Sequence, residues 1–154
     1  MERMVSVLFE SGGGIIDTLI KVVTMSRFSH CFSLRKAGFG VEALLTGVVA
    51  RKPRGNLTLV TVPIKNSYAY ESFLNKAVGK GYDFTGVLSF IMPFLRPSAK
   101  RWYCSELVME ALIAGGVDRS VFGNKKRISP KQLHAALIEY KKVAYNDSKN
   151  SASQ

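Results

Sequence analysis

The stretch RWYCSELVMEAL, residues 101–112, decides how the rest of this chain is interpreted. Apolar residues recur in it at helical spacing, which predicts a helix with one apolar face. That face consists of Cys104, Leu107, Val108, Ala111 and Leu112. Pro97 precedes the stretch and Gly115-Gly116 follow it, so the sequence supplies both a start and a stop for the helix.

Cys104 falls in the first turn of this predicted helix. The unpaired N–H groups and the positive end of the helix dipole favour a thiolate there, and so lower the pKa of a thiol. Free cysteines are also among the most buried residues and usually do no more than pack. From the helix alone, packing is the better interpretation of Cys104. Two other polar residues make a catalytic role the better interpretation.

These two residues are a histidine and a glutamate on neighbouring predicted strands. Alternation over Ser29–Arg35 predicts a strand on which His30 lies with the apolar side chains Phe32 and Leu34. Lys36–Gly40 turns the chain, and Val41–Val49 reads as the next strand, with Glu42 as its one acidic group. Burying that carboxylate without a partner would be costly. His30, across the hairpin, is the nearest candidate partner.

The parity of the hairpin register decides whether His30 and Glu42 meet. A two-residue loop at Ala37-Gly38 pairs positions whose numbers sum to 75 and places the two side chains on opposite faces. A three-residue loop gives a sum of 74 or 76 and makes them diagonal neighbours on one face. We expect the three-residue loop.

The remaining pattern predicts a single domain over residues 1–145, followed by a polar, disordered tail at 146–154. Within the domain we expect further strands at Met4–Phe9 and Asn56–Pro63, helices at Ile15–Val23, Tyr68–Val78, Phe84–Phe90 and Lys131–Tyr140, and loops at Gly81–Asp83 and Met92–Pro97. Asp83 is the expected N-cap of the third of these helices, and Ser129-Pro130 begins the last. His134, off the apolar stripe of that last helix, is expected at the surface.

Composition narrows the class of protein. The 154 residues carry a net charge of +11, with 47% hydrophobic and 21% charged residues, which is typical of a globular domain with a strongly basic surface. Such a surface suits an anionic polymer, an acidic lipid or a nucleic acid. Two cysteines make neither a disulfide framework nor a zinc site of the usual spacing, and we expect both to be reduced. No cofactor or metal is implied.

Two apolar segments of the chain are the candidates for a signal peptide or a transmembrane segment. The apolar run Val5–Phe9 is too short for a signal peptide, and Val87–Leu95 contains Ser89 and Pro93 and is too short to span a bilayer. We therefore expect synthesis in the cytoplasm without a transmembrane segment. Action outside the cell would need another route, such as phage-directed lysis, tail assembly or non-classical export.

Four pieces of sequence together resemble a known family. Ser29-His30, Val41-Glu42-Ala43, Gly81-Tyr82-Asp83 and Tyr103–Val108 look like the permuted papain-like enzymes of the NlpC superfamily, which includes cell-wall amidases and relatives of lecithin retinol acyltransferase. The histidine precedes the cysteine, as in the circularly permuted branch. The similarity runs from the first strand through Ser129-Pro130. The Cys-Ser-Glu-Leu-Val string is its most specific part.

The resemblance implies an α+β, circularly permuted papain-like fold, with an antiparallel sheet packed against the cysteine helix. It also implies a hydrolase or acyltransferase that cleaves an amide or ester bond through an acyl-thioester. Cys104 would be the nucleophile, His30 the general base and Glu42 the residue that orients His30. Tyr82, or the backbone N–H of Cys104, would help to hold the oxyanion.

The sequence also departs from the family pattern in two places. The Gly-Asp pair that often opens the first strand is missing before Met4-Val5-Ser6-Val7, which bears on the substrate cleft. Cys31 follows His30 where an aliphatic residue is common. Neighbouring residues on a strand face opposite ways, so we expect Cys31 to be structural.

Two other functions compete with the enzyme. The first is a nucleic-acid-binding protein, which the charge supports although no helix-turn-helix, zinc finger or aromatic-rich basic stripe is present, so we expect no stable nucleic-acid partner. The second is an inactive scaffold on the same fold. The sequence leaves open the acyl donor, the acceptor and the oligomeric state, and a cell-wall peptide or a lipid-like acyl group suits the basic surface.

Overall fold

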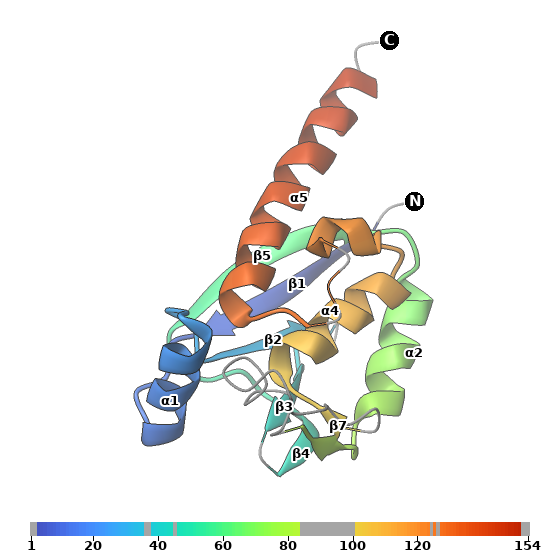
Figure 1. Cartoon of the computed structure of the whole chain (residues 1–154). Coiled ribbons are helices and arrows are strands. Elements are labelled where there is room, and N and C mark those ends of the chain that lie inside the picture. The colour runs from blue at the N-terminus through green and yellow to red at the C-terminus, as the bar shows by residue number, and fades with distance from the viewer. Residues whose placement is uncertain are drawn as a thin grey trace.

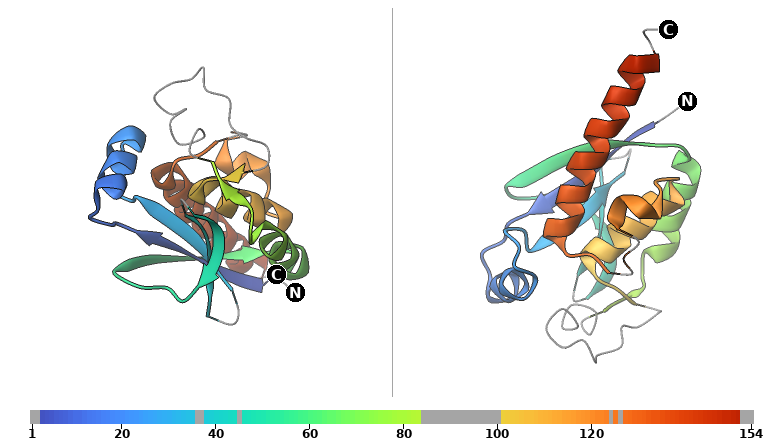
Figure 2. Two further views of the ribbon diagram at one scale, coloured as in Figure 1. Left: turned by 90° about the horizontal axis from the view of Figure 1, so that it is seen from below. Right: turned by 45° about the horizontal axis from the view of Figure 1, so that its top comes forward.

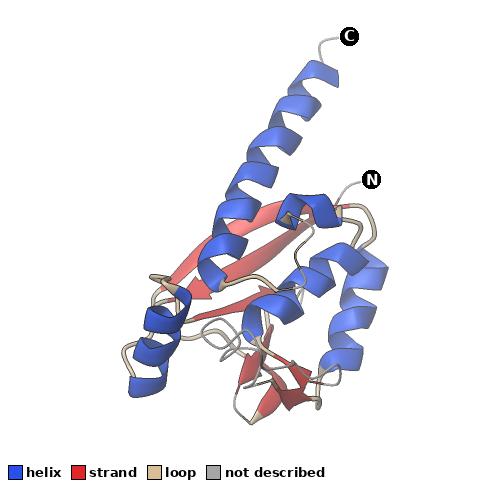
Figure 3. Ribbon diagram, viewed as in Figure 1, coloured by secondary structure: helices blue, strands red, loops and turns tan. Residues whose placement is uncertain are grey.

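The computed structural model describes residues 3–35, 38–44, 46–83, 101–123, 125 and 127–151. Its elements form an α+β fold with a five-stranded antiparallel sheet (Figures 1 and 3). In chain order they are β1 (Arg3–Glu10), α1 (Ile15–Thr24), β2 (His30–Leu34), β3 (Gly40–Leu44), β4 (Gly47–Arg51), β5 (Leu57–Ile64), α2 (Ser67–Ala77), β6 (Gly81–Tyr82), β7 (Arg101–Trp102), α4 (Cys104–Ala114), the 3-10 helix η1 (Arg119–Phe122) and α5 (Pro130–Ser151).

The main sheet has the strand order β4-β3-β2-β1-β5, and every neighbouring pair is antiparallel. The expected antiparallel sheet is thus confirmed. Side chains alternate along each strand, and one face of the sheet is buried against helices. The buried side chains of this face include Val7, Phe9, Cys31, Val41, Ala43, Val60 and Val62.

The predicted strand Val41–Val49 was wrong in one respect, because it is a hairpin of two strands, β3 and β4. Because most residues of Val41–Val49 are apolar, the turn was not evident from the sequence. Gly47 makes the turn possible, since its φ is 116°, a conformation that side chains with a Cβ rarely adopt. A Cβ there would also lie 2.7 Å from the backbone oxygen of Lys80. The hairpin brings Arg51 back beside the start of β3.

Helix α4 packs against β2 and β3 on the buried face of the sheet, with α2 on its other side. Figure 2 shows α4 and α5 on the same side of the sheet. The apolar face predicted for residues 104–112 is buried, as expected. Ser105 and Met109, outside that face, are also fully buried, and the Ser105 hydroxyl donates a 2.6 Å hydrogen bond to the Ile128 backbone oxygen. The helix is therefore a central core element rather than a one-sided surface helix.

Helix α5 begins where Ser129-Pro130 predicted and ends much later than expected. The Ser129 hydroxyl accepts a hydrogen bond from the Gln132 backbone N–H, and Gln132 Oε1 accepts one from the Ser129 N–H. The helix continues to Ser151, so residues 146–151 are helical rather than part of a disordered tail. Residues 146–151 are Asn, Asp, Ser, Lys, Asn and Ser, which have modest helix propensity, so composition alone did not predict the helix here. Figure 1 shows that the second half of α5 extends beyond the sheet.

The structure also differs from two smaller predictions. His134 is not a simple surface residue, because its ring packs against Phe9 and Phe28 at centroid distances of 5.0 and 4.9 Å. Gly81–Tyr82 forms the short strand β6, which pairs in parallel with β7, where a loop was expected. The helix predicted over Phe84–Phe90 and the loop over Met92–Pro97 lie outside the described residues.

Candidate active site

Cys104 is the first residue of α4, as predicted, and only 4% of it is exposed. Tyr103 is the N-cap residue, and its side chain makes no capping hydrogen bond. The first backbone hydrogen bond of the helix runs from the Leu107 N–H to the Tyr103 oxygen. Cys104 therefore lies at the helix end where the N–H groups have no partner within the helix and the dipole is positive.

The hairpin between β2 and β3 has the register that lets His30 and Glu42 meet. Its pairs Ser33–Val41 and Leu34–Gly40 both sum to 74, as expected for the three-residue loop. His30 Nε2 lies 2.7 Å from Glu42 Oε2, and 12% and 3% of the two side chains are exposed. Since Nε2 faces Glu42, the ring presents Nδ1 as its remaining nitrogen.

Arg51 adds a third member to this pair, and its role was not expected from the sequence. It lies on β4 opposite Gly40, diagonal to Glu42 on the same face of the sheet. Its guanidinium donates from Nε to Glu42 Oε1 and, at 3.3 Å, from Nη2 to Oε2. Burial alone would raise the pKa of Glu42, but the hydrogen bonds and charges of His30 and Arg51 lower it. The missed signal was the turn at Gly47, because only a hairpin returns Arg51 to Glu42.

The structure brings His30 and Cys104 together. Burial would lower the pKa of His30, but hydrogen bonds to Cys104 and Glu42, together with their negative charges, raise it to about 10. The pKa of Cys104 lies well below the ordinary thiol value, because hydrogen bonds from Cys31 and His30 and the charge of His30 outweigh burial. Both shifts favour a Cys104 thiolate beside a His30 imidazolium.

Cys31 is part of this cluster and not only a packing residue. It faces away from the strand face of His30, as expected, and is completely buried. That opposite face is the one against which α4 packs, so Cys31 and Cys104 lie in the same buried cluster, where each influences the pKa of the other. Burial, followed by the influence of Cys104, raises the pKa of Cys31 well above its ordinary value. Cys31 therefore stays protonated beside the thiolate.

The expected oxyanion contributors lie on two neighbouring elements. Tyr82 is on β6, beside Trp102 of β7, and β7 leads through Tyr103 into Cys104. The side chain of Tyr82 is outside what the structure describes. The backbone N–H of Cys104 is at the helix start, where it has no partner four residues earlier within the helix.

A second pair of carboxyl groups lies close to α4. Asp83 is buried and its backbone N–H donates to the Trp102 oxygen at 2.9 Å. Burial, followed by the nearby charge of Asp83, raises the pKa of Glu106 to about 7. Asp83 thus interacts with Glu106, whereas Glu42 holds the imidazole of His30.

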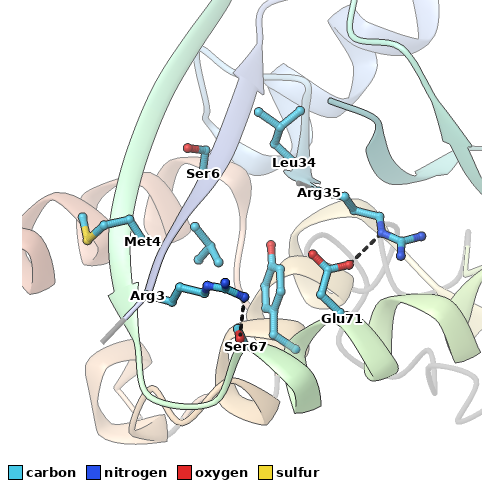
Figure 4. A pocket seen from close by; sticks show the side chains of 9 residues that line it. Arg3, Met4, Ser6, Leu34, Arg35, Ser67 and Glu71 are labelled. Carbon is cyan, nitrogen blue, oxygen red and sulfur yellow. Dashed lines mark hydrogen bonds and ion pairs between the residues drawn. The ribbon is translucent and has the colours of Figure 1, made fainter. Parts of the chain in front are cut away.

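A hollow of about 260 Å³ lies at the far end of β1 and β2, next to the start of α2. Figure 4 shows Arg35 pointing toward Glu71 and Arg3 toward Ser67 around it, and these pairs are 2.8 Å and 3.4 Å apart. None of the residues predicted to be catalytic lines it. It is separate from the cluster around Cys104.

No family model matches the chain, and no curated protein matches its sequence. In the part of the chain that the structure describes, no group of three or more His, Cys, Asp or Glu side chains is arranged to hold a metal ion. Within the same residues, none of the helices combines the length and the apolar character that crossing a membrane requires.

Proposed function

We propose that this chain is a cysteine-dependent hydrolase or acyltransferase that cleaves an amide or ester bond through an acyl-thioester on Cys104. We further propose that its α+β fold is the circularly permuted papain-like fold that the sequence resembles. One observation carries the proposal: a buried cysteine begins a helix and is hydrogen-bonded to a histidine, whose other side is held by a carboxylate. This is a nucleophile, a base and an orienting group in one connected chain.

In the proposed reaction the Cys104 thiolate attacks the carbonyl carbon of the substrate, and a carbon–sulfur bond forms. The His30 imidazolium donates its proton to the leaving amine or alkoxide as that group departs. His30, now neutral, then takes a proton from water or another acceptor, which attacks the thioester. The acyl group leaves with the acceptor, and Cys104 is again a thiolate.

Glu42 and Arg51 support the His30 proton cycle. Glu42 holds Nε2 at 2.7 Å, which leaves Nδ1 as the nitrogen that would serve Cys104 and stabilises the imidazolium. Arg51 fixes the Glu42 carboxylate through both of its oxygens. The oxyanion formed in each step would be held by the Cys104 backbone N–H, with Tyr82 as the side-chain candidate.

The net charge of +11 favours an anionic substrate, such as a cell-wall peptide on an acidic polymer or an acyl chain on an acidic lipid. Neither substrate class requires a cofactor, since the proposed steps use only protein groups. Whether the acceptor is water or a second substrate decides between hydrolase and transferase.

The proposal can be tested without a natural substrate. An activated ester, p-nitrophenyl acetate, should acylate Cys104, and intact mass should show one added acetyl group with a burst of nitrophenol. Cys104→Ala should abolish the burst and His30→Ala should slow it strongly, while Lys141→Ala, on the exposed part of α5, should leave it unchanged. Equal acylation of wild type and Cys104→Ala would contradict the proposal.

A second function, nucleic-acid binding on an otherwise inactive scaffold, is favoured by one observation. The chain has 22 lysines and arginines against 11 acidic residues. This excess would bind the phosphate backbone without requiring the Cys104 cluster, so the acylation experiment and a binding experiment distinguish the two functions.

A further inference from the structure

The proposed function gives a role to Cys104 and none to Cys31, although both belong to one buried cluster. Cys31 comes from β2 and Cys104 from the first turn of α4, and these two elements pack directly together. Cys31 is completely buried, belongs to the same core cluster as Cys104 and is the largest influence that lowers the pKa of Cys104. Both cysteines are free.

This arrangement differs from ordinary cysteine packing. Among the neighbours on its strand face, Phe9 lies opposite Cys31 in β1, and apolar groups surround both. An aliphatic side chain would fill such a position equally well. A thiol supplies something more, because a protonated sulfur beside a thiolate is the partner with which an oxidised cysteine reacts.

We propose that Cys31 is a resolving thiol and that it forms a reversible disulfide with Cys104 when a hydroperoxide oxidises the nucleophile. The inference rests on the proposed function in taking Cys104 as the reactive thiolate. It assigns a modification site that would switch off the same active site.

The chemistry needs one equivalent of hydroperoxide. The Cys104 thiolate attacks one peroxide oxygen, so a sulfur–oxygen bond forms, the oxygen–oxygen bond breaks and the leaving oxygen takes a proton from the His30 imidazolium. Cys31 then gives up its proton and attacks the Cys104 sulfur. A sulfur–sulfur bond forms, and the oxygen leaves as water. Together the two sulfurs lose two electrons, which the peroxide gains.

The position of the pair favours this second step over further oxidation. A disulfide requires the sulfurs to approach to about 2.0 Å, and the direct packing of β2 against α4 holds the two cysteines in one buried cluster from which such an approach is possible. Cys31 is also protonated and buried, so it is a poor target for the peroxide itself. Cys104 would be oxidised first, and Cys31 would trap it before a second oxygen is added.

The test uses hydrogen peroxide on the purified full chain, followed by intact mass and peptide mapping. Wild type should lose two hydrogens, give a cross-linked peptide pair containing Cys31 and Cys104, and recover full p-nitrophenyl acetate acylation after dithiothreitol. Cys31→Ser and Cys31→Ala should instead gain two or three oxygens at Cys104 and not recover. Each variant is first required to acylate Cys104 in the reduced state, which shows that its site is folded.

The outcomes separate this inference from the proposed function. The resolving role would be overturned if reduced wild type acylates normally but its Cys104 is oxidised to a sulfinic acid as fast as in Cys31→Ala. The proposed function would then still stand. A Cys31–Cys104 cross-link in protein that is never acylated would support the thiol pair and count against the acyl-transfer function. Recovery by dithiothreitol in wild type only, with the mapped cross-link, is the supporting result.

Discussion

The Cys104 thiolate is the group on which the proposed chemistry depends, and three neighbours stabilise it. They are the start of α4, the His30 imidazolium and the Cys31 thiol. A helix start and a neighbouring imidazolium are the usual causes of a low pKa in reactive cysteines. The third adds a hydrogen bond from a side chain that stays protonated because it is buried. The two cysteines therefore differ sharply in thiolate content at the same pH.

Alkylation should reveal this difference directly. At mildly acidic pH, iodoacetamide should modify Cys104 well ahead of Cys31, because only the thiolate reacts. His30→Ala should slow the reaction at Cys104 by about tenfold for each unit by which its pKa rises. Mass spectrometry of the peptides containing Tyr103-Cys104-Ser105 and His30-Cys31 gives both rates. Equal, slow labelling of the two cysteines in folded protein would mean that Cys104 is only a core residue.

Glu42 should control both the rate and its pH dependence. Glu42→Gln retains an acceptor for the imidazole N–H but no longer stabilises imidazolium, so acylation should be slower, and Glu42→Ala should be slower still. The sign of the pH effect follows from His30, whose pKa of about 10 is raised in part by Glu42. Turnover needs protonated His30 and is lost as pH rises through that pKa, so both variants should lose activity at lower pH than wild type.

The control for Glu42 is a carboxyl group in a different contact. Asp83→Asn should leave the alkaline limb of the pH profile in place, because Asp83 interacts with Glu106 and not with the His30 ring. If Glu42→Ala kept full activity and Asp83→Asn lost it, the orienting role would pass to Asp83. The full pH–rate profile of p-nitrophenyl acetate acylation separates these results.

At the scale of the elements, the site depends on two hairpins and one helix start. The β2–β3 hairpin could be placed from sequence, because only one loop length lets buried Glu42 meet His30. The β3–β4 hairpin could not, because most residues of Val41–Val49 are apolar and its turn depends on the backbone conformation of Gly47. The proximity of Cys31 and Cys104 also could not be predicted from the sequence, since it depends on which face of the sheet α4 covers.

The start of α5 gives a stability prediction that is independent of catalysis. Ser129 caps the helix through its hydroxyl, and Gln132 returns a hydrogen bond to the Ser129 N–H. Ser129→Ala should lower the free energy of unfolding by about 1 kcal/mol, the usual cost of losing such a cap. Urea unfolding followed by circular dichroism measures it.

The matched control lies on the same helix. Lys141→Ala changes an exposed side chain in the middle of α5 and should alter the free energy of unfolding by less than about 0.5 kcal/mol. Equal stability of Ser129→Ala and wild type would show that the start of α5 is not coupled to the cooperative core.

At the scale of the whole molecule, the net charge and the candidate active site at Cys104 are independent properties. The net charge of +11 was evident from the sequence and predicts long-range attraction of anions. The α+β class and the antiparallel sheet, which the family resemblance implied, are both present in the structure. The extension of α5 was not predicted, because residues 146–151 are polar and of modest helix propensity, which is compatible with either a free tail or an exposed helix.

This separation gives the last prediction, which concerns salt. If binding to nucleic acid is only charge attraction, the affinity for a short DNA duplex should fall linearly on a log–log plot against salt, and should be the same for unrelated sequences. Fluorescence anisotropy with two duplexes of different sequence measures this. Acylation of Cys104 by neutral p-nitrophenyl acetate should change little over the same salt range, because the buried Cys104–His30 pair is screened far less than surface charge. A clear preference for one duplex that survives at about 200 mM salt, combined with no acylation, would favour the nucleic-acid function over the enzyme. Loss of both DNA affinity and acylation at the same salt concentration would place basic surface groups inside the catalytic step, which the burial of the cluster argues against.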